Sequence, residues 1–200
     1  MNLEDPDDTW LVRLHRACDR NDLAKVRALI KSCEEGTLCG IVEGYDESPL
    51  HVACCDGYTA IVKCLLESDR IKVDVNLRDD SGRTALHRAC HHGKTNIVKY
   101  LMELARAHVD INIRDNHSNT PMQSACYHGH KDIVEYFMRS DRNNVDINPR
   151  NTKGETPPHW ACRRVSSDLR YQMESNDVGA AINSNVRNNN GDTLLHLACR

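Results

Sequence analysis

Histidine and cysteine recur together along this chain at a spacing that could bind a metal ion. Side chains three positions apart are neighbours on a helix, and zinc accepts both nitrogen and sulfur ligands. Each pair offers two ligands where a closed structural site needs four, and Gln123 interrupts the series. We therefore predict that the pairs bind no metal. The five pairs are His15/Cys18, His51/Cys54, His87/Cys90, His159/Cys162 and His196/Cys199.

The ten cysteines are a second candidate for chemistry. Five stand at intervals of 36 residues and a sixth follows after 37, namely Cys18, Cys54, Cys90, Cys126, Cys162 and Cys199. The 200-residue sequence starts with an acidic stretch instead of a secretory signal, so a reducing compartment fits better than a disulfide scaffold. Packed helices lie about 8 to 10 Å apart, beyond the roughly 7 Å that separates disulfide Cα atoms. We expect the regular cysteines to be buried thiols.

Motifs that indicate an enzyme are missing from the sequence, which has no Gly-rich phosphate loop, nucleophile elbow, His-Glu-x-x-His or Cys-x-x-Cys. The formal net charge of -3 gives no general attraction to nucleic acid or to an anionic membrane. No apolar run approaches the roughly 18 residues of a membrane helix. We predict no catalytic residue, no cofactor and no membrane association, and a cytoplasmic or nuclear location.

The elements that position these residues are predicted by the heptapeptide that ends at each regular cysteine, as at 84–90 and 120–126. Thr caps a helix by accepting a backbone N–H, and Pro is tolerated at the first helical position. Gly93 and Gly129 then end short helices, because glycine readily takes the left-handed conformation. Apolar residues at i, i+1, i+4 and i+5 form one stripe along a helix, so they predict a second helix. In two units these are Ile97, Val98, Leu101, Met102 and Ile133, Val134, Phe137, Met138.

Copies of a Thr-Pro-Leu-His-x-Ala motif, repeated from about residue 10 to the end of the sequence, resemble the ankyrin repeat family. The resemblance implies an all-α solenoid of helix-turn-helix units joined by β-hairpin-like loops. It also implies that the motif histidine bonds the cap residue and neighbouring backbone, and that the cysteine replaces a common alanine. The implied organisation is an acidic tail at 1–9 and a repeat domain at 10–200, with units at 10–45, 46–81, 82–117, 118–153, 154–190 and a partial unit at 191–200.

In ankyrin proteins the partner surface is concave, with the first helices as palm and the hairpin tips as fingers. Carried over by position, the resemblance implies a palm of Arg88, His91, His92, Tyr127, His128, Trp160, Arg163 and Arg164. The implied tips are Asp80, Arg83, Asn116, His117, Asn119, Lys153 and Glu155. Arg, Tyr and Trp are frequent interface hot spots and Arg pairs with carboxylates, so we predict an acidic partner across units three to five. The alternative interpretation is that these are ordinary solvated side chains. The histidines predict that partner binding depends on pH near 6 to 7.

The resemblance implies a protein–protein interaction module with a protein or peptide partner, and we predict no obligate homo-oligomer. One alternative is a regulatory array of a larger enzyme or channel whose domain lies beyond Arg200. Another is a nucleic-acid surface at Arg163 and Arg164, which the net charge disfavours. Asn112 resembles asparagines that are hydroxylated in ankyrin repeats, and Leu104 stands eight residues before it as in such targets. Turn formation is the alternative for this asparagine.

Overall fold

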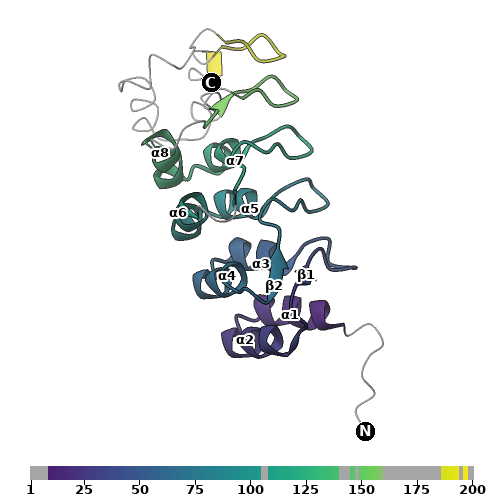
Figure 1. Cartoon of the computed structure of the whole chain (residues 1–200). Helices are drawn as coiled ribbons and strands as arrows, with labels where there is room; N and C mark the ends of the chain where they lie inside the picture. The colour runs from purple at the N-terminus through teal and green to yellow at the C-terminus, as the bar shows by residue number, and fades with distance from the viewer. Residues whose placement is uncertain are drawn as a thin grey trace.

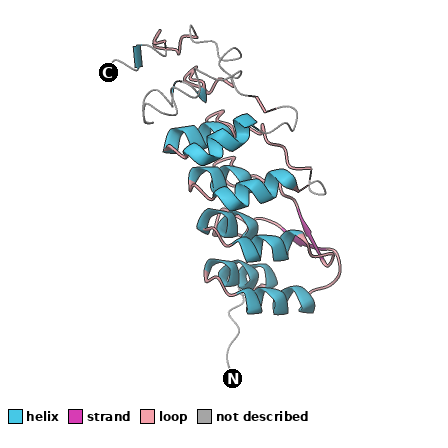
Figure 2. Ribbon diagram, turned by 90° about the vertical axis from the view of Figure 1, so that its left-hand side faces the viewer, coloured by secondary structure: helices cyan, strands magenta, loops and turns pink. Residues whose placement is uncertain are grey.

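Pairs of helices stack along one axis in the computed structural model, and this stack is called the pile below. Hairpin turns project from one side of it (Figure 1). The structure describes residues 9–104, 108–139, 145–146, 149–157, 159, 186–193 and 196–197. Figure 2 shows the same pile after a quarter turn, with the helices as two stacked columns. The helices of the described part are α1 (Trp10–Asp19), α2 (Leu23–Ser32), α3 (Pro49–Asp56), α4 (Thr59–Leu66), α5 (Ala85–His91), α6 (Thr95–Glu103), α7 (Pro121–His128) and α8 (Lys131–Arg139).

The first helix of each central pair starts at the predicted cap. Ser48, Thr84 and Thr120 precede α3, α5 and α7, and each side chain accepts the backbone N–H three residues later. Pro49 and Pro121 stand at the first helical turn, where a missing N–H costs no intrahelical bond. The prediction from the sequence that helices start after these residues is therefore confirmed.

The same helices end beside glycine. Gly57 and Gly129 cap α3 and α7 in the left-handed conformation, with φ of 92° and 75°. In α5 the cap is His92, and Gly93 follows with φ of 68°. Each glycine takes the left-handed backbone conformation that reverses the chain into the second helix, at less strain than a residue with a side chain.

The core is a continuous column of small and aliphatic side chains between the helices. Each unit repeats a set such as Leu86, Ala89 and Cys90, all of which are at most 1% exposed. The second helices add the predicted stripe, of which Ile97, Val98, Leu101, Met102, Ile133, Val134 and Phe137 are buried and Met138 is half-buried. Small residues on the first helices allow neighbouring units to approach closely, which is why the pile needs almost no aromatic residues.

Two short strands interrupt the otherwise helical architecture of the described residues. They are β1 (Thr37–Cys39) and β2 (Ile71–Val73), which pair in parallel with Thr37 opposite Ile71 and Cys39 opposite Val73. Both lie in stretches that follow the second helix of a pair. The strands tie the first unit to the second.

The same pattern of side-chain to backbone hydrogen bonds stabilises four of the hairpin turns. At Asp79, Asp115, Asn151 and Asn188, a buried side-chain Oδ1 accepts the backbone N–H groups two and four residues later. Successive turns are also joined to each other, for example by Asn116 N–H to the Ser81 carbonyl at 3.1 Å. Four turns, at 79–83, 115–119, 151–155 and 188–192, therefore form one ordered row. No helix in the described part is long and apolar enough to cross a membrane.

Candidate partner-binding site

Two of the motif histidines, His51 and His87, each join one unit to the next. His87 Nδ1 accepts the Thr84 backbone N–H at 3.1 Å, and its Nε2 lies 3.0 Å from the Asn119 carbonyl oxygen. Since a backbone N–H can only donate and a carbonyl can only accept, the ring is neutral with its proton on Nε2. Burial lowers the pKa of His87 to about 4, which favours this neutral form. His51 makes the same two contacts, so both ring nitrogens serve the fold, as the resemblance implied.

Gln123 takes the histidine position in the next unit and performs the same task. Its Oε1 accepts the Thr120 N–H at 2.9 Å, and its Nε2 donates to the Glu155 carbonyl at 3.0 Å. Among the described residues no group of three or more His, Cys, Asp or Glu could hold a metal ion. Histidine and glutamine therefore both make this connection between the helix cap and the next unit.

The regular cysteines pack as predicted. Cys18, Cys54, Cys90 and Cys126 are fully buried free thiols, whereas Cys162 and Cys199 lie outside the described residues. Burial raises the pKa of Cys54, Cys90 and Cys126, the last to about 12. A thiol must ionise to act as a nucleophile, so these sulfur atoms fill space in the core.

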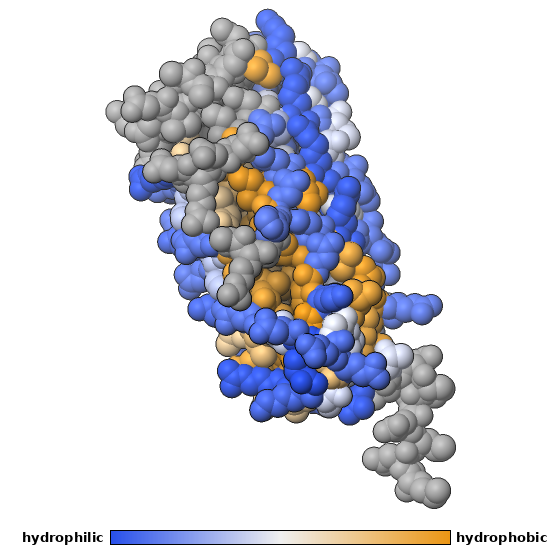
Figure 3. Space-filling model, in the orientation of Figure 1, coloured by the Kyte–Doolittle hydropathy of each residue, from blue (hydrophilic) through white to orange (hydrophobic). Residues whose placement is uncertain are grey.

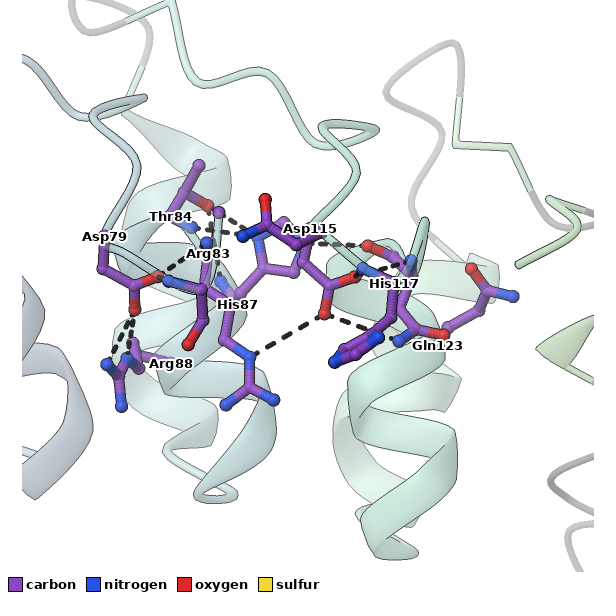
Figure 4. Close-up of polar contacts among 12 residues, drawn as sticks. Asp79, Arg83, Thr84, His87, Arg88, Asp115, His117 and Gln123 are labelled. Atoms are coloured by element: carbon purple, nitrogen blue, oxygen red, sulfur yellow. Dashed lines mark hydrogen bonds and ion pairs between the residues drawn. The ribbon is translucent and has the colours of Figure 1, made fainter. Parts of the chain in front are cut away.

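Arg88, predicted as a palm residue that would meet an acidic partner, is already paired within the chain. Its Nε and Nη2 each lie 2.7 Å from Asp79 Oδ2 (Figure 4). Glu47 Oε2 lies 3.4 Å from Nη2. The Asp79 side chain is fully enclosed and also accepts two backbone N–H groups of its turn. Asp79 was not singled out from the sequence, although its recurrence as Asp115 one period later was visible.

The predicted tip residues divide into exposed and structural groups. Asp80, Asn116, His117 and Lys153 are exposed. Arg83 Nε lies 3.7 Å from Asp115 Oδ2 (Figure 4). Asn119 donates a side-chain hydrogen bond to Asp115, and its backbone carbonyl accepts one from His87. Glu155 is 3% exposed, and its backbone holds Asn151 and Gln123, so its position differs from the exposed tip that the resemblance implied. The tips therefore offer fewer free side chains than expected.

A groove of about 430 Å³ lies between α5, α7 and the turns at 115–119 and 151–155. We call it the α5–α7 groove. Its lining includes the basic and aromatic side chains of Arg83, His91, His117, Tyr127, His128 and Lys153. The acidic residue in the lining, Asp115, is 1% exposed in its side chain and neutralised by Arg83. Not all predicted residues of this region line the groove. Those that do are Arg83, His91, His117, Asn119, Tyr127, His128 and Lys153, and those that do not are Asp80, Arg88, His92 and Asn116.

Imidazole rings cluster at one wall of this groove. The ring centroids of His91 and His128 are 3.8 Å apart, and those of Tyr127 and His128 are 4.8 Å apart. The ring centroid of His92 lies 4.7 Å from that of His91, but His92 does not line the groove. Burial, and then the charges of His128 and Arg83, lower the pKa of His91 to about 4. The His91 ring is therefore uncharged at neutral pH in the free protein, and the pH effect on partner binding stays a prediction.

Other predicted residues lie outside the groove or outside the described part. Trp160, Arg163 and Arg164 are not among the described residues. Asn112 is half-buried, and its Oδ1 accepts the Asp146 backbone N–H at 2.9 Å, which links two successive units. Its hydroxylation stays a prediction.

Polar residues dominate the surface on the hairpin side, while apolar residues reach the surface mainly in the middle and lower parts of the view in Figure 3. Two large apolar side chains of the described part are exposed, Leu38 on β1 and Tyr45, at 73% and 39%. Neither lies in the α5–α7 groove. The groove therefore offers mainly polar and aromatic contacts to a partner.

Comparison with known proteins agrees with the repeat geometry. A family model described as ankyrin repeats (3 copies) matches residues 14–115, 71–148 and 103–172. No curated protein matches the chain. Ankyrin repeats are generally protein–protein interaction modules and are typically not catalytic. With the matched residues extending from 14 to 172 and the helix pairs stacked in one pile, the chain belongs to the ankyrin repeat family.

Proposed function

We propose that the chain binds a partner protein through its concave face, and that an acidic segment of the partner lies in the α5–α7 groove. The observation that carries this proposal is the lining of the groove, where Lys153 is exposed and Asp115 is the acidic residue among the described lining residues. Asp115 is enclosed and held by Arg83 and by two backbone N–H groups. An acidic segment would supply the missing counter-charge.

The neighbouring turns toward the N-terminus support this placement. Asp46 and Asp80 are exposed there, and repulsion from Asp46 raises the pKa of Asp80. Glu47 also has a raised pKa, first because of burial, and Arg88 beside it acts in the opposite direction. An acidic segment would be repelled from these residues and directed toward the units of α5 and α7.

A fluorescently labelled hexa-aspartate peptide, titrated at pH 7.5 and low salt, tests the proposal. Lys153→Glu should weaken binding about three- to tenfold, because an attraction becomes a repulsion of on the order of 1 kcal/mol. Lys25→Glu is the matched control, since it makes the same charge change at an exposed residue of α2, away from the groove. Equal weakening by both variants, or no binding of the peptide, would contradict the proposal.

A further inference from the structure

We propose that the α5–α7 groove binds a partner carboxylate together with a proton, which the facing imidazoles of His91 and His128 receive. This inference rests on the proposed function and adds to it a form of regulation, because binding then depends on pH. The proton comes from solvent and is released when the partner leaves.

The geometry places the two rings where they can share one anion. His91 is the last residue of α5 and His128 is the last residue of α7, so the two rings lie at the same end of neighbouring helices. Their ring centroids are 3.8 Å apart, and both rings line the groove. His130 Nε2 lies 2.8 Å from the His91 carbonyl oxygen and fixes the adjoining turn to α5. The pair is therefore held in place before a partner arrives.

The charged groups around His91 are mostly basic. Arg83 reaches it from the turn at 79–83, Arg88 and His92 lie on its own helix, and His128 faces it from α7. Asp115 and Lys153 line the groove from the two tips. Asp56 and Lys94 act on His92 on the far side, together with His130. Burial and these neighbours lower the pKa of His91 to about 4, so its ring is uncharged at neutral pH.

A bound carboxylate would reverse this balance. An opposite charge within about 4 to 6 Å favours the charged form of an imidazole. If binding restores the His91 pKa from about 4 to its ordinary value of about 6.5, linkage requires affinity to rise about tenfold between pH 7.5 and 5.5. Close to one proton should then be taken up per complex at the lower pH.

Isothermal titration calorimetry with the full chain and hexa-aspartate measures both quantities. Aspartate side chains have a pKa of about 3.9, so the peptide stays ionised at pH 7.5 and at pH 5.5. Titrations at each pH are run in two buffers that differ in ionisation enthalpy, because the difference in heat counts the protons taken up. We expect an affinity gain of about tenfold at pH 5.5, with uptake of about one proton.

The double variant His91→Gln plus His128→Gln keeps polar side chains at both positions but cannot titrate. It should bind the peptide with the same affinity at both pH values and take up no proton. His92→Gln is the matched control, because it removes an ionisable ring from the end of α5 that does not line the groove. This control should retain most of the tenfold effect.

The outcomes separate this inference from the proposed function. Binding that is equal at both pH values, without proton uptake, overturns the inference and leaves the proposed function standing. Binding at pH 5.5 but not at pH 7.5 supports the inference and removes the proposed function at neutral pH. A pH effect that survives in the double variant, or no binding at either pH, overturns the inference.

Discussion

In the second, third and fourth units, one side chain three residues after the helix cap joins that unit to the next. His87 and Gln123 both accept the N–H of a cap threonine and both face a carbonyl 32 residues further along the chain. The position therefore requires one acceptor and one donor at a fixed separation, and it requires no imidazole chemistry. This explains why a glutamine can interrupt the histidine series without interrupting the pile.

His87→Gln should consequently be tolerated, whereas His87→Ala should lower the free energy of unfolding by about 1 to 3 kcal/mol. Alanine would leave the Thr84 N–H and the Asn119 carbonyl, both now bonded to His87, without a partner. Urea unfolding at pH 7.5 measures the difference. Equal losses for the two variants would show that the bonds matter less than the space the ring fills.

Arg88 illustrates how a residue of the expected type can serve the fold instead of a partner. Its guanidinium neutralises the enclosed Asp79, so Arg88→Ala should lower the free energy of unfolding by about 2 kcal/mol. The same variant should change hexa-aspartate affinity less than twofold, because this arginine is already occupied. Weakened binding with unchanged stability would instead assign Arg88 to the partner surface.

Among the elements, the helices could be predicted from the sequence because every signal for them is local. The cap at Thr84, the apolar residues of α5 and the glycine after it lie within ten residues of one another. The pairing of β1 with β2 could not be predicted in this way, since Thr37 meets Ile71 only after two intervening helices have packed. Contacts between units depend on the pile as a whole.

The turns between paired helices give a prediction at this scale. Gly93 and Gly129 have similar positive φ, but a Cβ at Gly93 would lie 2.7 Å from the His130 ring, while a Cβ at Gly129 meets nothing within 4 Å. Gly129→Ala should cost about 1 kcal/mol for the left-handed backbone alone. Gly93→Ala should cost more, because His130 must leave the His91 carbonyl. Urea unfolding of both variants checks the order, and His130→Ala should remove the difference.

For the whole molecule, the repeat period predicted which residues share the concave face, but not their state of charge. The family pattern placed Arg88, His91 and His128 together, and the structure agrees for the two histidines. The enclosure of Asp79 and the low pKa of His91 depend on burial and on neighbours from other units, which spacing alone does not reveal. The candidate site therefore changed from an arginine surface to a groove of lysine and imidazoles.

The buried imidazoles should also make the stability of the whole pile depend on pH. Burial lowers the pKa of His15, His51, His87 and His159, and that of His87 falls to about 4. An unfolded histidine binds its proton near pH 6.5, so unfolding takes up protons between pH 6.5 and 4. The stabilisation is complete above pH 6.5 and is lost as pH falls toward 4, by on the order of 3 kcal/mol for His87 alone.

Urea unfolding at pH 7.5, 6.0 and 5.0 measures this loss, with the free energy of unfolding falling at each step. His87→Gln supplies the control, because it keeps the two hydrogen bonds and removes one titrating group, so its stability should fall less steeply. Glu47 acts in the opposite direction, since its raised pKa favours proton binding in the folded state. A stability that is constant from pH 7.5 to 5.0 would mean that the rings are protonated inside the pile, and that the neutral form inferred from the Thr84 and Asn119 contacts is wrong.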